Sequence, residues 1–173
     1  MTDDLFSKPA EYTIDSSSLM AIFGDEPWTS KKITTGLWRN VSALIEQGII
    51  ISHEEVLLEI KKDEDKGEEL FTWAHAHNQV FRPHDERGEG AVIRLMSTEF
   101  KDFVNRKLDH VYADPWLIAQ AKHRGIKIIS EERLSTSPHP KNWAIPNVCA
   151  DSAFQVVCLD LWGLAKEQKW TFK

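Results

Sequence analysis

The chain has 173 residues and a formal net charge of −6, which is the size of one domain whose core needs no disulfide or metal. We therefore expect a single domain over residues 1–173. The negative charge argues against a protein that coats nucleic acid non-specifically, because such binding depends on neutralising phosphates. The start is rich in Asp, and no apolar run approaches the roughly 20 residues of a membrane helix. We expect a cytoplasmic protein with no membrane partner.

Short β-branched runs alternate along the chain with segments of helical periodicity. The Ser52 and Glu55 pair has the spacing of a capping box, which predicts that a helix starts there. The strands that we expect are residues 11–14, 49–51, 80–81 (or an extended connection there) and 126–130. The helices that we expect are residues 16–23, 33–47, 52–61, 65–78, 91–108 and 114–124, and one that begins near 151. Residues 82–90 and 133–146 are expected loops, and 170–172 either close the sheet or fold back.

This alternation predicts an α/β fold: three layers, α/β/α, around a central and mostly parallel sheet. In such sheets, sites form beyond the carboxyl ends of the strands, where the strand order reverses. Asp15 directly follows the first expected strand, and Glu131 and Glu132 follow the strand at 126–130. We therefore expect these carboxylates on one rim of the sheet.

Asp114 stands before Pro115, and this pair is also an ordinary way to start a helix, with Asp as the cap and Pro in the first turn. Capping and metal binding are compatible, because one carboxylate oxygen can accept a backbone N–H while the other faces a cation. Asp15, at the end of a strand and before a helix, has the same two interpretations.

The helix expected at 52–61 offers three further carboxylates, and a helical wheel separates them. With about 100° per residue, Glu59 lies closer to the apolar arc around Val56 and Ile60 than Glu55 does. Glu59 therefore flanks the buried face, whereas Glu54 and Glu55 are expected to face water or the helix N-terminus.

Four short acidic motifs, in this order, resemble the motifs of PIN-domain proteins. They are Ile14-Asp15-Ser16-Ser17, Glu55 to Ile60, Ala113-Asp114-Pro115-Trp116-Leu117-Ile118-Ala119, and Ile128-Ile129-Ser130-Glu131-Glu132. The resemblance covers nearly the whole chain. The chain is similar in particular to a PIN-like branch that carries the Ala-Asp-Pro-Trp-Leu-Ile-Ala motif and a later Ile-Pro-Asn-Val-Cys segment, here Ile145 to Cys149.

The resemblance implies a compact nuclease domain in which acids at these positions bind Mg²⁺ or Mn²⁺. Carried over position by position, the metal-binding and catalytic acids are Asp15, Glu59, Asp114 and Glu132. The fourth acid usually sits two residues after a Ser or Thr that ends the strand, which selects Glu132 over Glu131, although relatives often have Asp there. Asp109 is a reserve candidate.

Many PIN-domain relatives are ribonuclease toxins of toxin–antitoxin pairs, so the resemblance implies a metal-dependent endoribonuclease that uses a metal-activated water. Its partners would be an RNA substrate, a protein antitoxin and, in a homodimer, a second copy of the chain. Two alternatives stay open: a catalytically inactive binding or regulatory module of the same fold, and a structure-specific DNA nuclease. The chemistry agrees with a metal site, because hard divalent cations prefer carboxylate oxygens and activate water for attack on phosphates.

Other chemistries have little support. The chain has no glycine-rich motif for a nucleotide cofactor. His75 and His77 point in different directions on a helix, so we do not expect them to form a metal site. Cys149 and Cys158 lack zinc-site spacing and are expected to be buried thiols. Tryptophans mainly fill cores, although Trp28 or Trp116 could stack on a nucleobase. The slightly basic stretch 71–130 could hold a phosphate backbone, but a solvated helix face explains it better.

Overall fold

The computed structural model describes residues 9–23, 31–62, 68–105 and 112–172, and for 31–34 only the backbone. Within these residues, five strands form one sheet in the order β3-β2-β1-β4-β5, and every neighbouring pair is parallel. The strands are β1 Tyr12–Ile14, β2 Ile50–His53, β3 Phe81–Arg82, β4 Lys127–Ile129 and β5 Cys158–Leu159.

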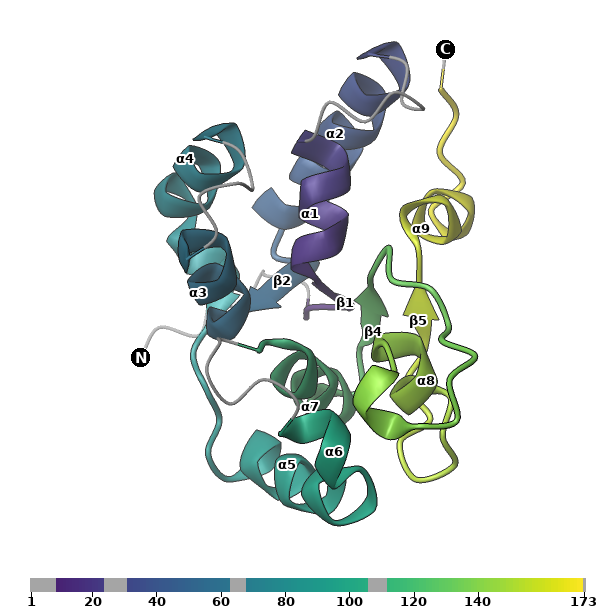
Figure 1. Cartoon of the computed structure of the whole chain (residues 1–173). Coiled ribbons are helices and arrows are strands. Elements are labelled where there is room, and N and C mark those ends of the chain that lie inside the picture. Colours follow the sequence, from purple (N-terminus) through teal and green to yellow (C-terminus); the bar gives the residue numbers. More distant parts are fainter. Residues whose placement is uncertain (1–8, 24–30, 63–67, 106–111, 173) are drawn as a thin grey trace.

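Helices cover both faces of the sheet and complete the expected three-layer α/β/α fold. Figure 1 shows α1 and α2 on one side and α5, α6 and α7 grouped on the other. This split follows from the strand order, because the connections after β1 and β2 run one way along the sheet and those after β3 and β4 run the other way. The helices are α1 Ser16–Phe23, α2 Lys31–Glu46, α3 Glu54–Lys62, α4 Glu68–Ala76, α5 Gly88–Glu99, α6 Lys101–Val104, α7 Asp114–Arg124, α8 Ile145–Cys149 and α9 Leu161–Glu167.

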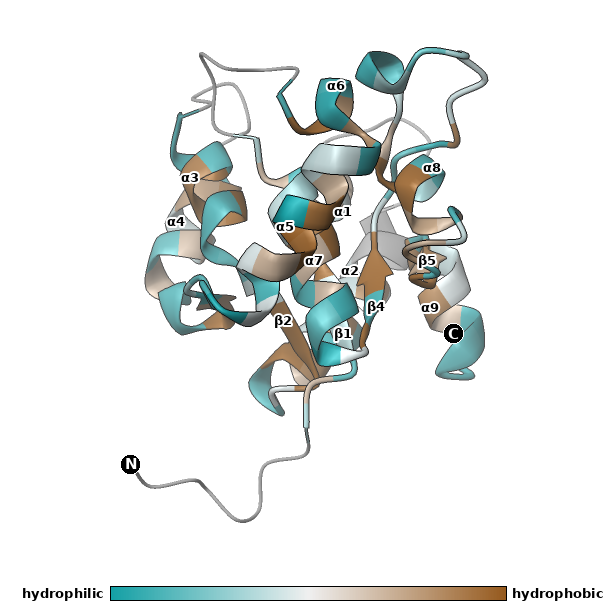
Figure 2. Cartoon of the chain, turned by 90° about the horizontal axis from the view of Figure 1, so that it is seen from below, coloured by the Kyte–Doolittle hydropathy of each residue, from teal (hydrophilic) through white to brown (hydrophobic). Residues whose placement is uncertain are grey.

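The core lies between the sheet and these helices, and its largest fully buried side chains include Tyr12, Phe103 and Phe154. Figure 2 shows the apolar character of β2 and β4 at the centre of the molecule, with hydrophilic residues on the outer turns of the helices. The strands of an all-parallel sheet are covered on both faces and are therefore apolar along their length rather than alternating. None of the described helices is long and apolar enough to cross a bilayer.

β1 is the central strand, and the strand order reverses there. β1 pairs with β2 on one side and with β4 on the other, and the N–H of Asp15 extends the second pairing by donating to the carbonyl of Ile129 at 2.9 Å. The carboxyl ends of β1 and β4 therefore lie side by side, as expected. This edge is the kind of position at which parallel sheets build sites.

Buried side chains of β1, β2 and α7 fasten these elements together below that edge. The hydroxyl of Thr13 donates to Gln120 Oε1 at 2.6 Å, and Gln120 Nε2 donates to the carbonyl of Ser52 at 3.3 Å. The hydroxyl of Ser52 in turn donates to the carbonyl of Ile14 at 2.7 Å. Buried polar groups need such partners, so this network fixes the position of α7 against the two central strands.

The capping role expected for Ser52 was wrong. Ser52 lies inside β2 and is fully buried, because its hydroxyl bonds to the neighbouring strand. The helix α3 starts at Glu54 instead, and the imidazole of His53 accepts the N–H of Glu55 at 3.1 Å. The imidazole of His53 thus has the capping role that the sequence pattern assigned to Ser52.

Two helices differ from the expected segments. The helix expected at 91–108 starts earlier, at Gly88, and breaks at Phe100, whose backbone is not helical (φ −133°, ψ 51°); the Phe100 ring packs on Trp143 and Phe154. The helix expected from 151 was also wrong, because that region contains turns and the edge strand β5. Residues 106–108 and 65–67 of the expected helices lie outside the described residues.

The other expected segments agree with the structure to within a few residues. The loop expected at 133–146 contains one short 3-10 turn, Pro140–Asn142, and gives way to α8. The end of the chain folds back rather than joining the sheet, because the Phe172 ring lies beside Gly36 and against Trp162.

Replacement of Gly125 by Ala is expected to destabilise the fold by about 1 kcal/mol. Gly125 ends α7 with a left-handed backbone, φ 66°, and an added Cβ would meet nothing within 4 Å, so the loss comes from backbone strain alone. Urea unfolding of Gly125→Ala measures it. The matched control is Gly90→Ala inside α5, which should be neutral or stabilising, and equal effects of the two variants would contradict this account of α7.

Candidate functional site

The carboxylate of Asp15 is buried at the reversal point, with the residue only 2% exposed. Its Oδ1 accepts the N–H of Ser16 at 2.7 Å, and its Oδ2 accepts the hydroxyls of Ser17 at 2.6 Å and Ser130 at 3.1 Å. Hydrogen bonds to a charged acceptor are the strong kind and offset the cost of burying it. The first turn of α1 and the end of β4 together fix the orientation of this carboxylate.

Glu59 joins the same network from α3. The hydroxyl of Ser16 lies 3.0 Å from Glu59 Oε2 and 3.4 Å from Asp15 Oδ1, so one hydroxyl lies between the two carboxylates. The other oxygen, Glu59 Oε1, accepts the N–H of Ala113 at 2.9 Å. The orientation expected from the helical wheel is therefore confirmed: Glu59 points inward, to the starts of α1 and α7.

Asp114 is buried, 6% exposed, and is the first residue of α7. The cap position itself belongs to Ala113, so the expectation that Asp114 occupies it was wrong by one residue, whereas Pro115 stands in the first turn as expected. A carboxylate in the first turn of a helix is favoured by the helix dipole. Glu59 accepts the N–H of Ala113, the residue before Asp114. The start of α7 therefore lies next to Glu59.

The two acids after β4 point to different places. Glu131 Oε1 accepts the N–H of Leu161, the first residue of α9, at 2.7 Å. Glu132 Oε2 accepts the N–H of Ile145, the first residue of α8, at 2.8 Å, while the backbone N–H of Glu132 donates to Ser130 Oγ. Ser130 also donates to Asp15, which connects Glu132 to the other acids.

The thiol of Cys149 lies near two of the four acids. Its hydrogen bond with Cys158, its burial and the neighbouring carboxylates of Asp114 and Glu132 all raise the pKa of the Cys149 thiol above its ordinary value. Cys149 is therefore a neutral, buried thiol, as expected, and Cys158 is a half-buried free thiol. The choice of Glu132 over Glu131 as the fourth acid stays a prediction.

The four expected acids lie at the same edge of the sheet, and we call Asp15, Glu59, Asp114 and Glu132 the four-acid cluster. The hydroxyl of Ser16 connects Asp15 with Glu59, and Ser130 connects Asp15 with the backbone of Glu132. Glu59 also bonds to the N–H of Ala113, the residue before Asp114. An all-oxygen set of carboxylates suits a hard divalent cation. The metal-binding roles stay predictions, and the reserve candidate Asp109 lies outside the described residues.

Sequence reasoning missed a second set of chemically active side chains. His53, His84 and Glu89 each offer one ligand atom, and these atoms lie within 4.8 Å of one another. A signal for the first two was available, since His53 ends β2 and His84 follows β3 closely, at the same edge of the sheet. Glu89 had no such signal, because it lies inside a stretch expected to be a loop.

The remaining candidates lie apart from the four-acid cluster or have structural partners. His77 Nδ1 contacts the carbonyl of Trp73, whereas the His75 ring stacks on Phe71, so the two histidines do not come together. The Trp116 ring stacks on His53 and meets His84 edge to face, and Trp28 lies outside the described residues. In the basic stretch, the described side chains Arg82, Arg87, Arg94 and Lys101 are exposed, as a solvated face predicts.

Replacement of Glu131 by Gln should change how stability depends on pH. Burial, and then the nearby Asp160, raise the pKa of Glu131 above its ordinary value of 4.5, against the opposing N–H of Leu161. The folded protein therefore binds this proton more tightly than the unfolded chain, so wild-type stability falls as pH rises above the ordinary value. Gln can still accept the Leu161 N–H. The variant should gain stability relative to wild type as pH rises, measured by urea unfolding at several pH values.

The control for this pH effect is Glu167→Gln, which should behave with the opposite sign. The Lys127 ammonium, and then Tyr12, lower the pKa of Glu167 below its ordinary value of 4.5. Its contribution to stability is present above that value and is lost as the pH falls. A stability difference between Glu131→Gln and wild type that does not vary with pH would contradict the burial of the Glu131 carboxylate.

The comparisons with known proteins give one finding. A family model described as "Domain of unknown function (DUF4411)" matches residues 12–172. Neither the search of curated proteins nor the search of solved structures found a match. The matched region spans all five strands of the sheet and the four-acid cluster. The chain belongs to the DUF4411 family.

Proposed function

We propose that this protein is a metal-dependent endoribonuclease and that the four-acid cluster is its active site. One observation carries the proposal: Asp15 and Glu59, from distant parts of the chain, share the hydroxyl of Ser16 at the edge where the strand order reverses. Carboxylates placed this close repel one another, and a bound cation relieves that repulsion. Asp15, Glu59 and Glu132 each also accept a backbone N–H at the start of a helix, so the proposal rests on the closeness of Asp15 and Glu59.

The protein's own groups would hold and orient a cation. Asp15, Glu59, Asp114 and Glu132 are the residues that would bind Mg²⁺ or Mn²⁺, and their oxygen-only character fits these ions. When bound, such an ion supplies a water of lowered pKa and neutralises charge on the phosphate. Ser17 and Ser130 hold Asp15 by hydrogen bonds to Oδ2, and such supporting contacts fix a ligand's direction.

The choice of RNA over DNA, and the role of a toxin with a protein antitoxin, rest on the resemblance to PIN-domain proteins. The cluster itself supports only the more general chemistry, which is metal-assisted hydrolysis of a phosphodiester. Competition between single-stranded RNA and a flapped DNA duplex for the same enzyme distinguishes the two substrates. Faster cleavage of the flapped DNA would favour the structure-specific DNA nuclease.

Asp15→Asn and Asp114→Asn should each lower the rate of RNA cleavage by about a hundredfold or more, because removing one ligand charge forfeits several kcal/mol of electrostatic stabilisation. Cleavage of a fluorescent RNA in Mg²⁺ or Mn²⁺ measures this. The matched control is Asp102→Asn, an exposed acid on α6, which should cleave like wild type. Equal cleavage by all four proteins would overturn the assignment. No cleavage and no calorimetric Mg²⁺ or Mn²⁺ binding would favour an inactive binding module.

Ser17→Ala should weaken Mn²⁺ binding by about tenfold to a hundredfold, as losses of supporting contacts usually do. The hydroxyl of Ser17 donates to Asp15 Oδ2 at 2.6 Å, so its removal frees the carboxylate to rotate. Calorimetric titration with Mn²⁺ measures the affinity. The control is Ser97→Ala, whose hydroxyl bonds only within α5, to the carbonyl of Ile93. Unchanged affinity in Ser17→Ala would show that Asp15 needs no such support or binds no metal.

A further inference from the structure

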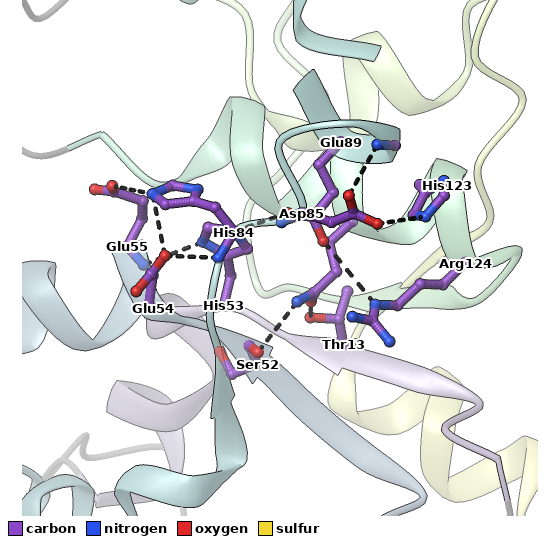
Figure 3. Close-up of polar contacts among 12 residues, drawn as sticks. Thr13, Ser52, His53, Glu54, Glu55, His84, Asp85, Glu89, His123 and Arg124 are labelled. Carbon is purple, nitrogen blue, oxygen red and sulfur yellow. Dashed lines mark hydrogen bonds and ion pairs between the residues drawn. The ribbon is translucent and has the colours of Figure 1, made fainter. Parts of the chain in front are cut away.

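A second group of ligand atoms lies beside the four-acid cluster, at the ends of β2 and β3. His53 is the last residue of β2, His84 follows β3, and Glu89 lies in the first turn of α5. One ligand atom from each lies within 4.8 Å of the other two. Figure 3 shows their side chains among polar partners from several elements. His53 and Glu89 are fully buried, and His84 is about one third exposed, its side chain at 30%.

Two of these residues bury a ligand atom that has no hydrogen-bond partner among the described residues. These atoms are Glu89 Oε1 and His84 Nδ1. The Nε of Arg124 lies 4.0 Å from Glu89 Oε1, which is too long for a hydrogen bond. Buried polar atoms are nearly always satisfied by protein, water or an ion. Two orphaned atoms on neighbouring residues therefore call for a partner that the described residues do not supply.

The carboxylate partners of His84 lie at one ring nitrogen and leave the other, buried nitrogen available as a ligand. The opposite ring nitrogen, His84 Nε2, lies 3.1 Å from Glu55 Oε1 and 3.2 Å from Glu54 Oε1, as Figure 3 shows. In the neutral tautomer whose Nε2 proton faces these two carboxylates, the lone pair is on Nδ1. Metal-binding histidines are commonly oriented by a carboxylate in this manner.

The local charge also favours a cation. Glu54, Glu55 and Glu89 carry three negative charges around the two imidazoles, and Arg124 supplies one positive charge next to Glu89. Outside this group, Asp85 pairs with His123 at 3.0 Å. The net charge of this group remains negative whether or not His123 is protonated. It therefore attracts a dication more strongly than it attracts a neutral water molecule.

We propose that His53, His84 and Glu89 form a second metal site that takes a borderline transition-metal dication of the Zn²⁺ class. Two imidazole nitrogens and one carboxylate oxygen are ligands that such ions accept and that Mg²⁺ does not favour. This site goes beyond the proposed nuclease function and does not depend on it. Ligand atoms around a tetrahedral Zn²⁺ lie about 3.3 Å apart, so binding draws the three residues closer, and the partly exposed His84 can move.

His53 must change tautomer when the ion binds. Its Nδ1 now accepts the N–H of Glu55 at 3.1 Å, which places the ring proton on Nε2, 3.2 Å from Glu89 Oε2. Binding through Nε2 requires the ring proton on Nδ1 instead, and the Glu55 N–H then loses its acceptor. The amide of Glu55 is therefore a local reporter, at the start of the helix that carries Glu59.

Titration of the full chain with Co²⁺ tests this site. Co²⁺ bound by few ligands including nitrogen gives intense visible absorption, whereas an all-oxygen octahedral site gives weak bands. The wild type should develop the intense bands, and the Glu55 amide resonance should shift. His84→Ala and Glu89→Gln should each weaken Co²⁺ binding at least tenfold, and His84→Ala removes a partly exposed side chain, so it should still fold. His75→Ala, an exposed histidine on α4, is the matched control and should bind like wild type.

The outcomes separate this site from the four-acid cluster. Asp15→Asn should keep the intense Co²⁺ bands, even where it abolishes RNA cleavage, and this pattern supports two independent sites. Absence of intense bands in the wild type, or equal binding by wild type, His84→Ala and Glu89→Gln, would overturn the proposal. In that case a water molecule, rather than a metal, satisfies Glu89 Oε1 and His84 Nδ1.

Discussion

A carboxylate that is only 2% exposed must have its charge met by hydrogen bonds, and Asp15 meets this need with donors from two distant segments. Ser16 and Ser17 lie next to it on α1, and Ser130 comes from the end of β4, over a hundred residues later. The remaining contacts of the cluster build outward from these bonds. Ser16 reaches Glu59, and Ser130 accepts the N–H of Glu132.

The topology of the sheet makes this arrangement possible. Because β1 pairs with β2 on one side and β4 on the other, the chain must reverse direction across the sheet at β1. The helices that follow β1 and those that precede β4 lie on opposite faces of the sheet there. Both the four-acid cluster and the His53, His84 and Glu89 group lie along this edge. They differ in donor chemistry, with oxygen alone in the first and nitrogen with oxygen in the second.

The sequence predicted the features that depend on local pattern. The stop at Gly125 and the inward face of Glu59 follow from backbone preference and helical periodicity, and both agree with the structure. The role of Ser52 did not follow, because a serine before a glutamate suits a helix cap and a buried strand equally well until the partner strand is known. The final strand was missed for a similar reason: Val156 to Leu159 is a short apolar run that periodicity cannot assign to a strand or a helix.

The histidine and glutamate group could not be predicted because its members meet only through tertiary contacts. The positions of His53 and His84 near strand ends gave a partial signal, but nothing in the sequence indicated that Glu89, inside an expected loop, would join them. The four acids were chosen from the resemblance to the ordered motifs of PIN-domain proteins, and Glu59 also from the helical wheel. Their hydrogen-bonded connections needed the fold.

The most direct measurement is a crystal structure of the protein soaked in Mn²⁺, with the ion located by its anomalous scattering. We predict a strong anomalous peak in contact with carboxylate oxygens of both Asp15, which directly follows β1, and Asp114, the first residue of α7. A map with no peak there at millimolar Mn²⁺, while the same four carboxylates are ordered, would contradict the metal-dependent nuclease.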